Sequence, residues 1–141
     1  MDLPPELENH FGLHLHIGPG KDGTVKTDII NWTADFIFPV NEVEGIRLAK
    51  MEEIALMKLD TISRGGRKKD FWDMSEILEY HTLSFLLELY PKKYPYHNIE
   101  DVVKGMKDFT IAEEMPDPIC LKGRHWDLIK VEMQEAVSKL Q

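Results

Sequence analysis

The sequence has only one cysteine, Cys120, and no apolar run long enough to span a bilayer. A lone cysteine excludes an internal disulfide and is typical of a reducing compartment, so we expect a cytoplasmic protein. Residues 1–5 also lack the basic stretch and apolar segment with which a signal peptide begins. The composition therefore predicts a globular protein that makes no contact with a membrane.

Positive charge is scarce as well. Lysine and arginine total 17 against 25 aspartates and glutamates, which gives a formal net charge of −8. This balance argues against general, charge-driven binding to nucleic acid, because such binding needs cations that displace counterions. One local basic cluster stands out, formed by Arg64, Arg67, Lys68 and Lys69. It is either a solvated loop between two helices or an anion-binding site.

The chain has 141 residues and a hydrophobic content of 43%, which suits one domain with a core of its own. Alternating apolar residues predict antiparallel strands over residues 10–17 and 24–31, with further strands over 34–39 and 43–48. Helical periodicity predicts helices over 51–64, 70–80, 84–90, 99–108 and 124–140, the third of them ended by Pro91. We therefore expect an α+β fold in a single domain, 1–141. Residues 1–48 would form a small, mainly antiparallel sheet, and residues 49–141 a helical bundle.

Lys58 interrupts the apolar side of the first predicted helix. It lies seven residues after Met51 and four before Ile62, so it points in the same direction as their stripe. Lysine is almost never buried without a partner. Either its stem lies along the core with the ammonium in water, or it faces a cleft where it meets a carboxylate or a phosphate.

Asp70 and Asp73 open the second predicted helix, where the helix dipole favours carboxylates. Asp70 also lies close to the packing side of that helix, so we expect it to pair with Lys58 or Arg64. Such a pair would either brace a helical hairpin or belong to a functional site.

Asp28 occupies the middle of the second predicted strand, a place that disfavours aspartate. On an exposed face it would be tolerated, and in a cleft it could bind a metal ion such as magnesium. A two-metal phosphoryl-transfer centre needs several carboxylates, and one aspartate does not supply them.

Four segments share their order and spacing with one known family: residues 45–49 (GIRLA), 53–59 (EIALMKL), 64–65 (RG) and 69–74 (KDFWDM). Together they resemble the central signature of nucleotidyl transferases of the AbiEii/AbiGii toxin family. Residues 112–118 and 125–130 resemble that family's C-terminal stretch. The resemblance begins at about residue 23 and continues to the end of the chain.

The resemblance implies a polymerase-beta-like nucleotidyltransferase fold with a helical C-terminal part. Family members transfer a nucleotide from an NTP with magnesium, in some cases to tRNA, and many are the toxin half of a bacterial toxin–antitoxin pair. By resemblance, Asp28 is a catalytic carboxylate and metal ligand, Lys58 contacts the nucleotide's phosphates, and Asp70 is catalytic. Arg64, Lys69 and Asp73 fall in the same motif and are expected to help bind the nucleotide.

The family's opening motif, a Gly-Ser or Gly-Gly turn followed by Asp-x-Asp, does not occur in this sequence. We therefore expect an N-terminally truncated nucleotidyl transferase whose own activity is impaired for want of metal ligands. Two alternatives stay open. The chain is an active transferase, with tRNA as a possible acceptor, whose missing carboxylates come from a partner chain or from other residues of this sequence, or it is a non-catalytic module that binds an antitoxin-like protein. A sheet without its first strands has an open edge, which predicts a homodimer or another partner chain.

Overall fold

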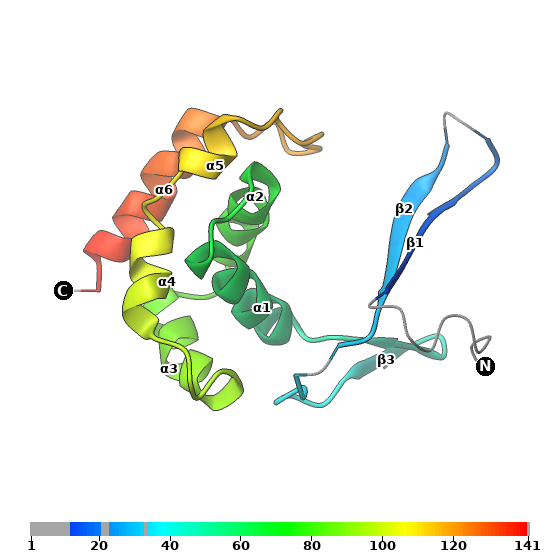
Figure 1. Cartoon of the computed structure of the whole chain (residues 1–141), viewed down its shortest axis with the longest axis horizontal. Coiled ribbons are helices and arrows are strands. Elements are labelled where there is room, and N and C mark those ends of the chain that lie inside the picture. The colour runs from blue at the N-terminus through cyan, green and yellow to red at the C-terminus, as the bar shows by residue number, and fades with distance from the viewer. Residues whose placement is uncertain (1–11, 21–22, 33, 141) are drawn as a thin grey trace. The chain divides into compact units, whose positions relative to one another are not determined.

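The computed structural model describes residues 12–20, 23–32 and 34–140, and its α+β class confirms the prediction (Figure 1). The chain divides into two compact units, residues 1–35 and residues 36–141. The single domain over 1–141 stays a prediction.

The first unit is a β-hairpin. Strands β1 (Gly12–Ile17) and β2 (Val25–Ile30) pair antiparallel, with Gly12 opposite Ile30 and Ile17 opposite Val25. Leu13 and Leu15 are half-buried while the intervening histidines are exposed, which is the alternation expected of a strand. The two predicted strands are confirmed here, although residues 10 and 11 lie outside the described part of the chain.

The second unit begins with a segment that the sequence analysis predicted wrongly. Residues 34–39 form no strand. The backbone N–H groups of Ile37 and Phe38 instead donate to the Glu53 carboxylate, over 3.0 Å and 3.1 Å. Because a side chain satisfies both donors, the segment needs no neighbouring strand.

The predicted strand over 43–48 is in fact a turn with a short strand on each side. Strands β3 (Asn41–Val43) and β4 (Ile46–Leu48) pair antiparallel. Glu44 and Gly45 between them have positive φ angles of 52° and 79°. Two successive positive φ angles are the mark of the tight hairpin turn that matches the twist of two strands.

The helices of the second unit are α1 (Met51–Ser63), α2 (Lys68–Ile77), α3 (Leu83–Lys93), α4 (Ile99–Gly105), α5 (Thr110–Glu113) and α6 (Trp126–Ser138). Helix α1 packs against α2, α3 and α4, and α2 packs against α5 and α6 (Figure 1). Five of these helices were predicted, and the short α5 was not. None of the helices in the described ranges is both long enough and apolar enough to cross a membrane.

Helix α3 corrects the prediction that Pro91 ends it. The helix begins at the cap Thr82, whose hydroxyl accepts from the Phe85 N–H, and continues to Lys93. Tyr90 and Lys93, on either side of the exposed Pro91, are both buried and hold the last turn in place. Tertiary packing here outweighs the helix-breaking tendency of proline.

The core lies around α1. Ala55, Leu56, Leu59 and Ile62 are fully buried, but Met51 and Ile54 are 38% and 41% exposed. The predicted apolar stripe is therefore wrong in the first turn of the helix. Trp72 of α2 and Trp126 of α6 stack on each other, with ring centroids 6.0 Å apart and ring planes 7° from parallel, which fixes α6 against α2.

Candidate functional site

Lys58 lies between two carboxylates at the start of α2. Its Nζ donates to Asp70 Oδ1 over 3.0 Å and lies 2.6 Å from Asp73 Oδ2. The sequence predicted that Asp70 pairs with either Lys58 or Arg64, and the structure shows the pair with Lys58. The three side chains, which we call the Lys58 cluster, range in exposure from 2% for Asp70 through 24% for Lys58 to 52% for Asp73. The cluster is thus anchored in the core and open to solvent on one side.

Asp70 is held by the backbone as well. Its Oδ2 accepts from the N–H of Arg67 over 3.0 Å, and Arg67 Nε is 3.6 Å away. Arg67 has an extended conformation just before α2, so its N–H has no partner within the helix. A carboxylate three residues on can satisfy that N–H, and this explains why Asp70 points back toward α1.

Within the Lys58 cluster, each charged group shifts the pKa of its partner toward the charged form. Burial alone would raise the pKa of Asp70, but the hydrogen bonds from Lys58 and from the Arg67 backbone lower it overall. Burial would likewise lower the pKa of Lys58, yet Asp73 and Asp70 together raise it. All of these shifts favour the charged forms, so the ammonium lies in a fixed anionic setting at neutral pH.

Arg64 does not join this cluster. Its Nη2 donates to Asp60 Oδ2 over 2.6 Å, and its Nε donates to the Asp60 carbonyl oxygen. Asp60 also bonds Tyr90 of α3 and His97, which follows α3. Lys58, in contrast, bonds Asp70 of α2. The structure therefore separates two residues that the resemblance assigned to one nucleotide site.

Lys69 lines a pocket of about 420 Å³ together with Arg67, Lys68 and residues 115–118. Lys68 Nζ is committed there, because it donates to Asp117 over 2.9 Å and lies 5.2 Å from the centre of the Trp126 ring. Lys69 and Arg67 are exposed. The residues of the basic cluster therefore differ in their surroundings. Lys68 is buried and packs against Trp126, whereas Arg67 and Lys69 are exposed to solvent.

Asp28 belongs to the first unit. Its carboxylate is 2.7 Å from His14 Nδ1 on the neighbouring strand and 3.4 Å from Lys26 Nζ. The hydrogen bond with His14 is the main cause of a lowered pKa at Asp28. Histidine and lysine together occupy both carboxylate oxygens, an arrangement that an exposed strand face accommodates without a metal.

The metal ion that the resemblance implies can be tested against these donors. Among the described residues, no three histidine, cysteine, aspartate or glutamate side chains gather to hold a cation. Asp70 and Asp73 do approach one ammonium group from two sides. Two carboxylates suit magnesium only where water and substrate phosphates supply its other ligands. The residues fit an ion that arrives with a nucleotide, and they do not form a dedicated protein site.

Sequence reasoning missed two buried carboxylates of α1. Glu53 is fully buried and ion-paired with Lys93 of α3, and Asp60 is 4% exposed. Glu53, Leu56 and Asp60 occupy positions i, i+3 and i+7, so they share one face of the helix. A charged residue on an apolar helix face is the pattern that identified Lys58, and it applied to Glu53 and Asp60 as well.

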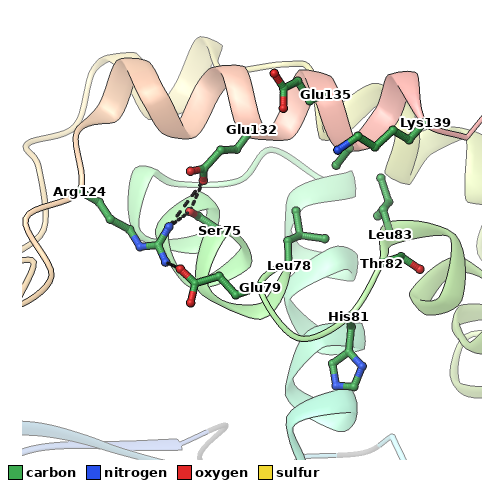
Figure 2. A pocket seen from close by; sticks show the side chains of 11 residues that line it. Ser75, Leu78, Glu79, His81, Thr82, Leu83, Arg124, Glu132, Glu135 and Lys139 are labelled. Carbon is green, nitrogen blue, oxygen red and sulfur yellow. Dashed lines mark hydrogen bonds and ion pairs between the residues drawn. The ribbon is translucent and has the colours of Figure 1, made fainter.

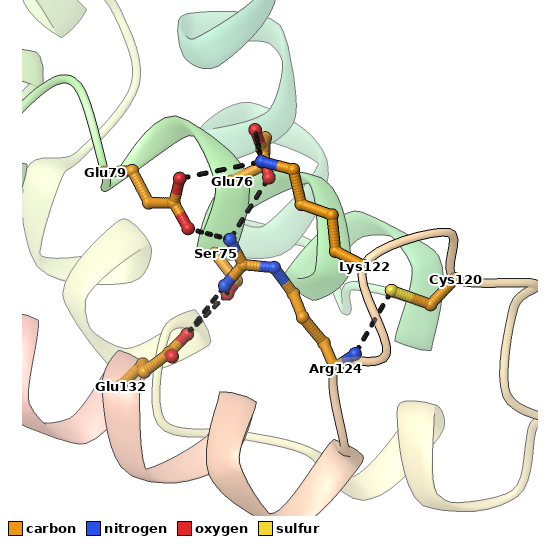
Figure 3. A network of polar contacts seen from close by, with 7 residues as sticks. All are labelled: Ser75, Glu76, Glu79, Cys120, Lys122, Arg124 and Glu132. Atoms are coloured by element: carbon orange, nitrogen blue, oxygen red, sulfur yellow. Dashed lines mark hydrogen bonds and ion pairs between the residues drawn. The ribbon is translucent and has the colours of Figure 1, made fainter.

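Arg124 was missed as well, and it forms the densest polar network of the described residues. Its guanidinium donates to Ser75 Oγ over 2.7 Å, to Glu76 over 3.1 Å and to Glu79, and it lies 3.6 Å from Glu132 (Figure 3). The same side chain borders a pocket of about 290 Å³ between the end of α2, the start of α3 and α6 (Figure 2). Since the guanidinium is surrounded by partners, it ties the segment before α6 to α2.

No protein-family model, no curated protein and no solved structure matches this chain. Of the predicted site residues, the structure brings together Lys58, Asp70 and Asp73.

Proposed function

We propose that the chain is a nucleotidyltransferase-like module of the AbiEii/AbiGii type, which binds the phosphates of a magnesium-bound nucleoside triphosphate at the Lys58 cluster. The observation that carries the proposal is the Lys58 ammonium, 24% exposed and held between two carboxylates. Its position in the helix motif of the resembling family supports the same assignment.

The chemistry of the cluster suits a nucleotide that carries its own metal. Magnesium takes carboxylate oxygens and phosphate oxygens in one coordination sphere, and a lysine ammonium is a point charge for phosphate. With such a ligand bound, Asp70 and Asp73 would hold the magnesium ion, and the Lys58 ammonium would hold the phosphates. A nucleotide without magnesium would meet two carboxylates and be repelled, so binding should require the metal.

Transfer itself needs more than this cluster. Two-metal phosphoryl transfer uses several carboxylates, and the sequence contains no Asp-x-Asp pair. In this proposal, activity toward an acceptor such as tRNA is impaired in this chain. Exposed Lys69 would lie along the path of the nucleotide or its acceptor.

Calorimetric titration of each NTP into the full chain, with and without magnesium, tests the proposal. We expect saturable heat only with magnesium and its loss in Lys58→Ala. Lys107→Ala is the matched control, because Lys107 is an exposed lysine of the same unit outside the cluster. Absence of binding at about 1 mM nucleotide, the weak end of ordinary enzyme affinities, would refute nucleotide binding by this chain.

One observation favours a second function, as a protein-interaction module. The β3–β4 hairpin exposes Val43, Ile46 and Leu48 to 53%, 62% and 46%. An isolated two-stranded hairpin is marginal in water, and its outer edges are unpaired within the described ranges. A second copy of the chain or an antitoxin-like protein could pair with such an edge and cover these side chains.

Light scattering after size-exclusion chromatography tests this alternative for the homodimer. A dimer that Ile46→Glu converts to a monomer would support pairing through the hairpin. A wild-type monomer at all concentrations would exclude self-association.

A further inference from the structure

On the side of α1 that faces α3 and α4, one buried carboxylate organises three other side chains. Asp60 accepts from the Tyr90 hydroxyl over 3.0 Å and from Arg64 Nη2 over 2.6 Å, and it lies 2.7 Å from His97 Nδ1. Tyr90 is fully buried, whereas the side chains of Arg64 and His97 are 67% and 48% exposed. The buried Asp60 carboxylate therefore fixes the orientation of two side chains at the surface, Arg64 and His97.

The contact with Asp60 orients the His97 ring. A carboxylate only accepts hydrogen bonds, so Nδ1 carries the proton that faces it. The ring also stacks on Tyr94, with centroids 5.2 Å apart and planes 9° from parallel. With Nδ1 engaged and the ring held, Nε2 is the nitrogen left for a ligand.

His97 and Arg64 line a pocket of about 320 Å³ with Ser63, Tyr96, Asn98 and Asp101. Arg64 bonds to Asp60 through Nη2 and Nε, and Asn98 Oδ1 accepts from the Glu100 N–H. Arg64 Nη1 and Asn98 Nδ2 are therefore donors that the described hydrogen bonds do not use. Asp101 is the exposed carboxylate of this pocket.

We propose that this pocket is a binding site for a tetrahedral oxyanion, namely the phosphate group of a small ligand. Arg64 Nη1 and Asn98 Nδ2 can each donate to an oxygen of such a group, and His97 borders the same pocket. Asp60 fixes the directions of the Arg64 and His97 side chains and so holds them at the pocket. Asp101 repels a dianion and weakens the site.

The proposal goes beyond the nucleotide site and is independent of it. Lys58 and Arg64 are bonded to different carboxylates, so one site can be removed without the other. Arg64→Gln should weaken oxyanion binding and leave the magnesium-dependent nucleotide heat, whereas Lys58→Ala should remove that heat and leave oxyanion binding.

Imidazole ¹H–¹⁵N NMR of the full chain at pH 6, titrated with sodium sulfate, tests the site. Sodium chloride at equal ionic strength controls for screening. We expect a saturable shift at His97 Nε2 with a dissociation constant on the order of 1 mM. His81, which pairs with Glu52, is the internal control and should not move.

Two variants should change the affinity for sulfate in opposite directions. Arg64→Gln should weaken binding about tenfold or more, because it removes a charge-assisted hydrogen bond. Asp101→Asn should tighten it by roughly two- to fivefold, because it removes an exposed like charge. Both residues are exposed, so folding should survive, and the amide spectrum confirms it. Equal shifts at His97 and His81, no saturation, or no gain in Asp101→Asn would each overturn the proposal.

Discussion

Replacing Lys93 by methionine should destabilise the helical unit severely. The Lys93 ammonium donates to Glu53, and both side chains are 0% exposed. Methionine keeps much of the aliphatic stem but leaves a fully buried carboxylate without this cation. Breaking a buried ion pair on one side costs about 3–5 kcal/mol. The Ile37 and Phe38 N–H groups still bond Glu53 Oε2, so we expect the lower end, about 3 kcal/mol.

Urea unfolding followed by far-UV circular dichroism measures this change. Lys92→Met is the matched control, since Lys92 is the exposed neighbour on the same helix and should shift stability by less than about 0.5 kcal/mol. The double variant Glu53→Gln/Lys93→Met removes both charges and should recover much of the loss, because a neutral pair has little desolvation cost. If Lys93→Met is as stable as Lys92→Met, or the double variant is no better than the single one, the reasoning is refuted.

Three other outcomes follow from single contacts. The pKa of Asp70 is lowered in the folded state, so its stabilising effect is complete above the unfolded value of about 3.9 and is lost as the pH falls through the folded value. Urea unfolding between pH 3 and pH 7 should therefore show a smaller acid loss in Asp70→Asn than in the wild type. Arg124→Ala removes charge-assisted hydrogen bonds from a side chain that is 13% exposed, and should cost about 1.5–3 kcal/mol in the same assay. A Cβ at Gly105 would lie 2.4 Å from the Ile62 carbonyl oxygen, so Gly105→Ala should push α4 away from α1. We expect a loss of about 1–3 kcal/mol in stability. An unchanged thermal midpoint would contradict this close approach.

Much of the fold could be predicted because it rests on local periodicity. The apolar spacing of residues 51–64 fixed a helix whose observed bounds are Met51–Ser63, and alternation around Leu13 and Leu15 fixed a strand. The errors fell where a distant partner decides the outcome. Residues 34–39 look like a strand, but their donors are satisfied by Glu53, and Pro91 stays helical because its neighbours are buried.

In the candidate site, too, local contacts could be predicted from the sequence and distant ones could not. The pairing of Lys58 with Asp70 could be predicted as one of two alternatives, because both residues lie on the packing sides of consecutive helices joined by a short connection. The bonds of Asp60 to Tyr90 and His97 could not be predicted, since these residues are 30 and 37 positions apart in sequence. Their contact depends on how α1 packs against α3, which is a property of the assembled core.

The sequence by itself determined the α+β class and the positions of the longer helices, because each depends on neighbours within a few turns. Only the tertiary structure decided that Asp70 pairs with Lys58 rather than with Arg64, and that Asp60 bonds Tyr90 and His97. The physical reason is that Asp60 and Arg64 are four residues apart at the end of one helix, whereas every other partner depends on which elements pack against α1.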